Sequence, residues 1–284
     1  MIAHIKNIVK NAELRGYAIG AFNIHGLESV LGVARGAVKA QSPAIIQVSE
    51  GAVEYIGLQN LAYLVSVVAE STAKAVPIAL HLDHGKNFDM VIACINAGFS
   101  SVHIDGSHLS LQENIELTKK VVSYAHKKKV WVQGEIGAII GGHGSAGGVL
   151  KGIPIADADE VIQFVNETKV DTIAAAIGTA HGVYKNEDII IPLLRKIKKE
   201  TGKTFVLHGG SGVDDAKIKQ AIRSGVNIIN IGSDIKFAFS NTLKQTCKNN
   251  KKETDPRKLL GPSIDAIEKV VIEKMRLFGS FKKA

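Results

Sequence analysis

Short apolar segments alternate with amphipathic segments along most of the chain, and this alternation most limits the folds that are open to it. Most of the apolar segments carry no polar residue in their inner stretch, as expected for parallel strands that are covered on both faces. Eight such strands are predicted, at Ala18–Asn23, Ala44–Ser49, Ile78–Asp83, Ser101–Asp105, Val130–Glu135, Thr172–Gly178, Thr204–His208 and Asn227–Ile231.

Segments with the apolar spacing of helices lie between these strands. They include Leu27–Ala40, Leu58–Ala73, Gln112–His126, Ala158–Glu167, Ile189–Thr201 and Asp214–Arg223. Asp157 is a predicted N-cap, and Gly98 and Gly202 are predicted helix stops. Eight strand–helix units within about 240 residues predict an α/β fold, the (β/α)8 or TIM barrel. The alternative, an open doubly wound sheet, usually has a glycine fingerprint after its first strand, and residues 23–26 do not form one.

The chain is expected to form a single domain, residues 1–284, with a barrel core at 1–245 and a C-terminal extension at 246–284. The extension begins with a basic connector. A helix, Ser263–Met275, is predicted to start near Pro262 and to stop at Gly279. It could cover the barrel or exchange with a partner subunit.

The loop Ile136–Asp157 after the fifth strand is long and rich in glycine. Such a loop on the active face of a barrel predicts a mobile lid, and a disordered insertion without a role is the alternative.

Composition narrows the classes of function. The net charge is +8, but the densest basic runs, 127–129 and 248–252, lack the interleaved aromatic residues of single-strand readers, so nucleic acid is not expected. The charge is read as solvated surface that could also attract an anionic metabolite. There is no apolar run long enough to span a membrane and no signal-peptide pattern at the start. Cys94 and Cys247 are too few for a disulfide framework, so a cytoplasmic location is expected.

Every predicted strand delivers a polar residue to the same rim. In chain order these residues are Asn23, Ser49, the pair Asp83 and His84, Asp105, Glu135, His181, His208 and Asn230. A single His near a strand end is usually a hydrogen-bonded residue of the core. Eight strands that all end in polar residues indicate a functional site instead. The imidazoles of His84, His181 and His208 can converge on one metal and leave a coordination position open for substrate.

Two glycine-rich turns, 208–212 and 230–234, follow the seventh and eighth strands, and each leads into a helix. Backbone N–H groups in such turns and at helix N-termini bind phosphate, and these two loops are the usual phosphate site of the fold.

A metal, a phosphate site and an Asp beside a metal ligand together predict retro-aldol cleavage of a phosphorylated ketose. The metal polarises the ketone, and Asp83 moves a proton on the substrate hydroxyl. The other aldolase chemistry needs a Lys inside the barrel. Lys129 and Lys203 both precede strands, so the metal route is favoured.

The chain also resembles the class II, metal-dependent ketose-bisphosphate aldolases, which act on fructose 1,6-bisphosphate or tagatose 1,6-bisphosphate. The resemblance extends over essentially the whole chain. It rests on the segments 20–23, 80–85, 97–102, 104–108, 178–182, 208–212 and 274–280, in this order.

The resemblance implies a catalytic Zn²⁺ on His84, His181 and His208, with Asp105 and Glu135 at positions that can hold a second or resting-state metal. It implies that Asp83 moves the C4-hydroxyl proton. Dihydroxyacetone phosphate and the rest of the substrate are expected to contact Asn23, Ser49, Gly182, Lys185, Gly209, Gly210, Ser211, Asn230, Ile231, Gly232 and Ser233. The resemblance further implies a Na⁺ or K⁺ ion near the phosphate, a homodimer or homotetramer, and Arg257 at the far phosphate, often across a dimer.

One residue departs from the family pattern. The family usually has a Glu in the mobile loop that exchanges the proton at the nucleophilic carbon, and His143 stands at that position. An imidazole can act as a base near neutral pH. Three alternatives stay open: another phosphorylated ketose such as 2-deoxy-5-keto-gluconate 6-phosphate, a metal-dependent hydrolase or isomerase, and a sugar-phosphate-binding protein without catalysis.

Overall fold

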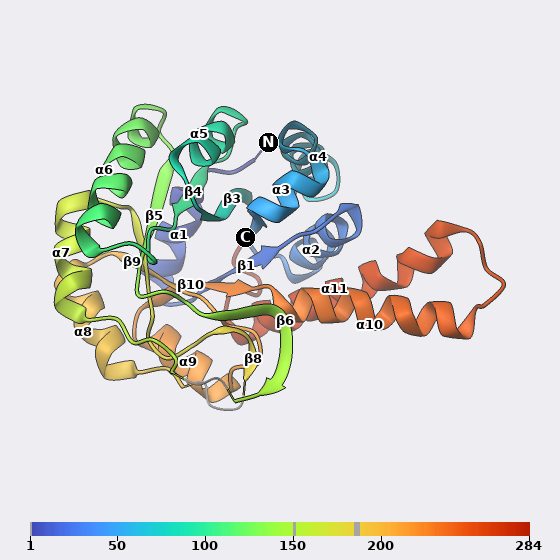
Figure 1. The fold of residues 1–284 in the computed structure, drawn as a ribbon. Coiled ribbons are helices and arrows are strands. Elements are labelled where there is room, and N and C mark those ends of the chain that lie inside the picture. The colour runs from blue at the N-terminus through green and yellow to red at the C-terminus, as the bar shows by residue number, and fades with distance from the viewer. Residues whose placement is uncertain (1, 150–151, 185–187) are drawn as a thin grey trace.

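Eight parallel strands close into a barrel in the computed structural model, which describes residues 2–149, 152–184 and 188–284 (Figure 1). In the order of their pairing, the strands are β1 (Ile19–Asn23), β10 (Val226–Ile231), β9 (Thr204–Leu207), β7 (Thr172–Ala175), β5 (Trp131–Ile136), β4 (Ser101–Ile104), β3 (Ile78–Gly85) and β2 (Ala44–Ser49). The pairing of β1 with both β2 and β10 closes the sheet. The predicted TIM barrel is confirmed.

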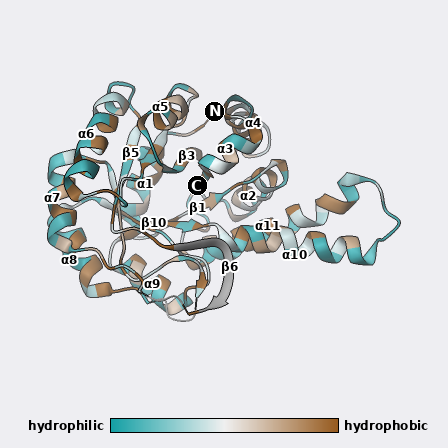
Figure 2. Cartoon of the chain, viewed as in Figure 1, coloured by the Kyte–Doolittle hydropathy of each residue, from teal (hydrophilic) through white to brown (hydrophobic). Residues whose placement is uncertain are grey.

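Helices surround the barrel. Their bounds are α1 (Ile5–Arg15), α2 (Leu27–Ala40), α3 (Glu50–Ile56), α4 (Leu58–Ser71), α5 (Phe88–Asn96), α6 (Leu111–Lys127), α7 (Ala158–Thr168), α8 (Ile191–Thr201), α9 (Asp215–Arg223), α10 (Ser233–Asn249) and α11 (Pro256–Leu277). Hydrophobic and hydrophilic residues alternate in bands along the outer helices, as amphipathic helices require (Figure 2). Asp157 caps α7 and Gly202 ends α8, as predicted.

Helix α1 was not predicted, and it closes the N-terminal end of the barrel. Its buried residues Ile5, Ile8, Val9 and Ala12 form one apolar cluster with strand residues. These strand residues point into the barrel and include Ile19, Ile45, Ala79, Ala174, Val206 and Ile228. The bottom of the barrel is therefore dry, and chemistry is confined to the other end.

The C-terminal half of α11 belongs to the helical ring. It packs against α2 at Gly32 and Gly36, where a methyl group would collide with Ile267 and Val271 respectively. Farther along, Met275 is fully buried. The first half of α11 pairs with α10 in an arm that extends beyond the barrel (Figure 1).

The predicted start of the last helix near Pro262 was wrong. Helix α11 begins at Pro256, where proline needs no hydrogen bond, and Asp255 caps it. Pro262 lies inside the helix, which therefore lacks one backbone hydrogen bond. Helix α10 runs through residue 245, the predicted end of the barrel core.

The glycine-rich segment after β5 contains a strand that the sequence did not predict. Strand β6 (Gly141–Gly148) pairs in parallel with β8 (His181–Tyr184) in a separate two-stranded sheet. Glycine has low β-propensity, so the pattern hid this strand. The pairing places the backbone of β6 beside His181.

Strand β7 ends three residues earlier than predicted, because Ile177 bridges to Ile155 instead of continuing the barrel ladder. Cys94 is a buried free thiol. Within the described residues, no single helix is long and apolar enough to cross a bilayer. Helices α3 and α4 together have the required length and composition, but they are bent by 93° relative to each other.

Candidate active site

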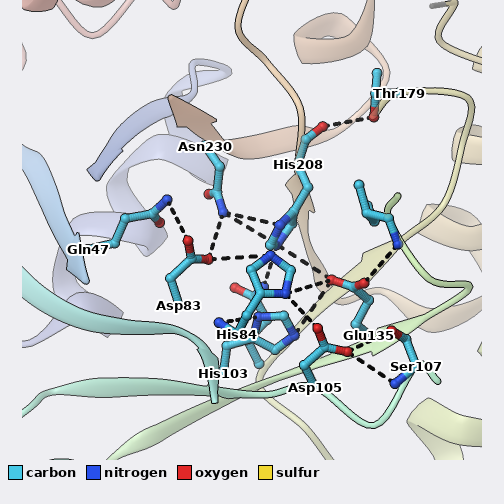
Figure 3. Close-up of polar contacts among 12 residues, drawn as sticks. Gln47, Asp83, His84, His103, Asp105, Ser107, Glu135, Thr179, His208 and Asn230 are labelled. Carbon is cyan, nitrogen blue, oxygen red and sulfur yellow. Dashed lines mark hydrogen bonds and ion pairs between the residues drawn. The ribbon is translucent and has the colours of Figure 1, made fainter. Parts of the chain in front are cut away.

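Imidazoles and carboxylates meet inside the C-terminal mouth of the barrel (Figure 3). Asp83 and His84 come from β3, His103 from β4, Glu135 from β5 and His208 from the end of β9. All of them except the partly buried His84 are buried. One ligand atom from each of Asp83, His84, His103 and His208 lies within 4.8 Å of the others.

The three histidines that the sequence singled out are neighbours. The ring centroid of His84 lies 4.8 Å from that of His181 and 4.7 Å from that of His208. The His181 and His208 centroids are 5.8 Å apart. The structure thus brings these imidazoles to one place, from three different strand ends.

The His84 imidazole is held by a carboxylate. Its Nδ1 donates to Asp105 Oδ2 at 2.6 Å, and Asp105 Oδ1 accepts from the backbone N–H and hydroxyl of Ser107. Its Nε2 is buried and has no hydrogen-bond partner in the described parts of the chain. A carboxylate on one nitrogen, with the other nitrogen left without a protein partner, is the usual arrangement of a metal-binding His. His84 also has a backbone φ of 52°, in the left-handed region.

His208 is fixed by amides. Its Nε2 lies 2.8 Å from Gln133 Nε2, and Asn230 Nδ2 lies 3.4 Å from both ring nitrogens. Its carbonyl accepts from the Thr179 hydroxyl at 2.8 Å. The Gln133 amide contacts Nε2, so Nδ1 is the nitrogen left for a metal. With a metal on Nδ1, the ring proton stays on Nε2 and is donated to the amide oxygen of Gln133, which rotation of the amide brings into place.

The electrostatic environment of the cluster makes His84 cationic and keeps two other histidines neutral. Burial lowers the pKa of His84, but the carboxylates of Asp83, Asp105 and Glu135 outweigh burial and raise this pKa to about 10. Burial, followed by the charge of His84, lowers the pKa of His208 well below its usual value. His103 is likewise neutral, because burial and His84 lower its pKa to about 3.

The carboxylates divide into two kinds. Burial raises the pKa of Asp83 and of Asp105, but the neighbouring His84 outweighs it, so both pKa values are lowered and both groups are ionised. Burial and the nearby Asp105 raise the pKa of Glu135 to about 8.

The residues fit a metal ion. His84 Nε2 and Glu135 Oε2 are buried atoms without a hydrogen-bond partner among the residues described. Such orphaned atoms are costly unless something binds them. A donor set of imidazole nitrogens and carboxylate oxygens suits Zn²⁺ and other first-row transition metals better than Mg²⁺ or Ca²⁺.

Asp83 has its own set of hydrogen bonds. Its Oδ2 accepts from Asn23 Nδ2 at 2.8 Å and from Gln47 Nε2 at 3.4 Å, and its Oδ1 accepts from Asn230 Nδ2 at 3.4 Å. Gln47 also donates to Asn23 Oδ1 at 2.9 Å. The amides hold the ionised carboxylate beside His84, whose Nε2 lies 3.8 Å from Asp83 Oδ1.

A small cavity adjoins this cluster and gathers most of the residues predicted to contact substrate. It is lined by Asn23, His181, Gly182, Gly209, Ser211, Asn230, Gly232 and Ser233. Helix α10 begins here with Gly232 as N-cap and no side-chain cap. A helix N-terminus without a side-chain cap favours an anion.

Other predicted residues lie apart from the cavity or outside what is described. Ser49 is in register with Asp83, but its hydroxyl accepts from Ala52 N and so caps α3. Arg257 is exposed and bonds Asp255 in the first turn of α11, at the outer end of the arm (Figure 1). Lys185 and the side chain of His143 lie outside the described residues. Gly210 and Ile231 do not line the cavity.

Three polar residues of the site, Gln47, His103 and Gln133, were not predicted from the sequence. Each stands two residues before a strand-end residue that was singled out, namely Ser49, Asp105 and Glu135. Residues two apart on a strand point to the same face. Extending each polar strand end inward by this period would have identified all three.

Comparisons with known proteins agree with this geometry. The family model described as class-II fructose-bisphosphate aldolase matches residues 3–283. The fructose-bisphosphate aldolase of Geobacillus stearothermophilus is 40% identical over 96% of each chain. The 6-phospho-5-dehydro-2-deoxy-D-gluconate aldolase of Bacillus subtilis is 39% identical over 99% of this chain and 96% of the relative.

Solved structures show the same fold. The YdjI aldolase of Escherichia coli superposes with a TM-score of 0.84, 28% identity and full coverage of both chains. The fructose-bisphosphate aldolase of Campylobacter jejuni has a TM-score of 0.83 and 25% identity, over 99% of this chain and 95% of the other. The chain therefore belongs to the class II fructose-bisphosphate aldolase family, whose members are metal-dependent aldehyde-lyases.

Proposed function

We propose that this enzyme catalyses the reversible retro-aldol cleavage of fructose 1,6-bisphosphate to dihydroxyacetone phosphate and glyceraldehyde 3-phosphate. The observation that carries the proposal is the convergence of His84, His181 and His208 beside an ionised Asp83 and a small glycine-lined cavity. The name of the 40% identical relative supports this sugar.

Zinc is the proposed metal, held by His84, His181 and His208. When bound there it would supply Lewis-acid polarisation of the substrate ketone. Asp105 orients His84 through its Nδ1, and Asp105 with Glu135 offers oxygen ligands for a second or resting metal ion. Gln133 and Asn230 restrict the rotation of His208.

Asp83 is the proposed base in the cleavage direction. Its carboxylate accepts the C4-hydroxyl proton as the C3–C4 bond breaks, and it returns that proton to the aldehyde oxygen in condensation. The charge of His84 keeps the carboxylate ionised, and the amides of Asn23, Gln47 and Asn230 hold it in place.

The phosphate of dihydroxyacetone phosphate is proposed to bind at Gly182, at Gly209–Ser211 and at the start of α10. Gly209 has a φ of 67°, and a methyl group there would collide with the Ala180 carbonyl. Only glycine therefore fits at this position of the turn. Ser211 accepts from Asp234 N at 3.3 Å and ties this turn to α10.

Further contacts of this site are also proposals. They are Asn23, Ser49, Lys185, Gly210, Asn230, Ile231, Gly232 and Ser233 for the substrate, His143 as the base at the nucleophilic carbon, and a Na⁺ or K⁺ ion near the phosphate. Arg257 lies far out on the arm. In a homodimer or homotetramer it would bind the distal phosphate of the substrate in a partner subunit. We also infer a single 1–284 domain and a cytoplasmic enzyme.

A second substrate has a specific observation in its favour, because a relative of almost the same identity is named 6-phospho-5-dehydro-2-deoxy-D-gluconate aldolase. Cleavage of this compound, fructose 1,6-bisphosphate and tagatose 1,6-bisphosphate should be measured side by side, with and without chelator. Chelator-sensitive turnover of fructose 1,6-bisphosphate far above the others is expected. Preference for another sugar would reassign the substrate, and no turnover by zinc-loaded enzyme would refute the proposal.

A further inference from the structure

His103 is a buried imidazole in the metal cluster, outside the set of residues that the family resemblance assigns. It is fully buried, and its ring centroid lies 4.7 Å from that of His84 and 5.4 Å from that of His208. By distance alone it qualifies as a ligand in both candidate metal groups. The hydrogen bond that His103 accepts from the His84 backbone indicates a different role.

The backbone N–H of His84 donates to His103 Nδ1 at 3.2 Å. An imidazole nitrogen that accepts a hydrogen bond carries no proton, so the proton of neutral His103 lies on Nε2. A metal on Nε2 would have to remove this proton and leave an imidazolate, or break the bond to His84. Both are unfavourable for a buried ring, so His103 is a poor ligand despite its position.

Glu135 Oε2 is the carboxylate oxygen near this proton, although the distance to His103 Nε2 exceeds a hydrogen bond and Nε2 has no hydrogen-bond partner among the described residues. It is buried without a hydrogen-bond partner in the described structure, and it lies 3.7 Å from His103 Nε2. The other nearby nitrogens are engaged elsewhere. His84 Nδ1, at 3.9 Å, donates to Asp105, and His208 Nε2, also at 3.9 Å, contacts Gln133.

We propose that His103 is a positioning residue and not a metal ligand: it couples the backbone of His84 to the Glu135 carboxylate and holds that carboxylate back from the metal of the three imidazoles. This rests on the proposed metal set and deepens it. Restraining Glu135 Oε2 keeps a coordination position open for the oxygens of the ketose phosphate. Residues that orient metal ligands in this way typically change metal affinity or activity by 10- to 100-fold when replaced.

The direct test uses the wild-type holoenzyme loaded with ¹¹³Cd²⁺ and labelled with ¹⁵N-histidine. His103 resonances are assigned by their loss in His103→Gln. The expected result is a protonated Nε2, an acceptor Nδ1 and no ¹¹³Cd coupling at His103, with coupling at His84, His181 and His208. Coupling at His103 Nε2 would overturn the proposal. Absence of coupling at the three other imidazoles would instead refute the metal set of the proposed function.

Two variants test the positioning role. His103→Leu removes the donor, whereas His103→Gln keeps an amide donor toward Glu135. We expect unchanged metal content in both, a 10- to 100-fold lower kcat/KM in His103→Leu, and recovery of most of it in His103→Gln. The visible absorption of the Co²⁺-loaded His103→Leu enzyme should weaken, because the freed Glu135 joins the metal. Wild-type kinetics and an unchanged spectrum in His103→Leu, or loss of metal from it, would contradict the proposal.

Discussion

The two ends of the barrel are built from the same strands and differ in almost every other respect. At the N-terminal end, Ile19, Ile45 and Val206 form a dry cluster with α1. A few residues farther along the same strands or just beyond, Asn23, Gln47 and His208 are also buried, yet they are polar. Gln47 donates to Asn23, Asn23 donates to Asp83, and His208 contacts Gln133. The strands thus keep stability at one end and chemistry at the other, and a substitution should affect mainly the property of its own end.

The largest effect is expected from Asp83→Ala at the polar end. Loss of the proposed base should lower kcat by 10²- to 10⁴-fold, the usual range for a general acid–base residue. Metal content should stay close to wild type, because Asp83 is not one of the three proposed ligands. Rates and metal content should be measured on the same zinc-loaded sample, and a rate within tenfold of wild type would refute the role of Asp83.

At the dry end, Ile8→Ala should lower the free energy of unfolding by about 2–5 kcal/mol, the cost of a large-to-small change in a core. Ile8 is 3% exposed and packs within the α1 cluster. Urea denaturation followed by circular dichroism measures the loss, and steady-state kinetics at 25 °C should be unchanged. A changed KM in the folded variant would break the division between the two ends.

Gly209→Ala at the polar end and Gly202→Ala elsewhere form a matched pair. Both glycines have positive φ, 67° and 62°, but a methyl group meets the Ala180 carbonyl only at Gly209, and nothing lies within 4 Å at Gly202. Gly202→Ala should lose about 1 kcal/mol of stability from the strained backbone. Gly209→Ala should lose more, because the collision with the Ala180 carbonyl adds to the strain. KM for the phosphorylated substrate should rise about tenfold only in Gly209→Ala, about 1.4 kcal/mol. Equal KM values in the two variants would argue against phosphate at this turn.

The smallest effect concerns pH and belongs to the polar end alone. In the metal-free enzyme the pKa of His84 is raised to about 10, so at neutral pH a metal has to displace its proton. Apparent zinc affinity should therefore increase with pH by up to about tenfold per unit below pH 10. Chelator competition at several pH values measures the slope, with His126→Gln at the exposed His126 as control. A flat profile would show that His84 binds no metal.

Much of this molecule can be predicted from its sequence, for identifiable reasons. The barrel was predictable because buried parallel strands are apolar on both faces. The histidines were predictable because each stands at or just beyond the end of an apolar segment. Helix α1 and strand β6 were not, since a plug and a glycine strand carry no strong periodic signal. His103 was hidden because its polarity stands inside a short apolar strand, and the length of α11 because Pro262 resembles a helix start.

Zinc-edge anomalous diffraction from crystals of the zinc-loaded enzyme with dihydroxyacetone phosphate tests the central claim most directly. We expect an anomalous peak at coordination distance from His84 Nε2 and from one nitrogen each of His181 and His208. Asp83 should lie beside the ligand, and His103 should lie outside coordination distance. A peak held by His103 instead of His181, or no zinc in the mouth of the barrel, would contradict the central claim.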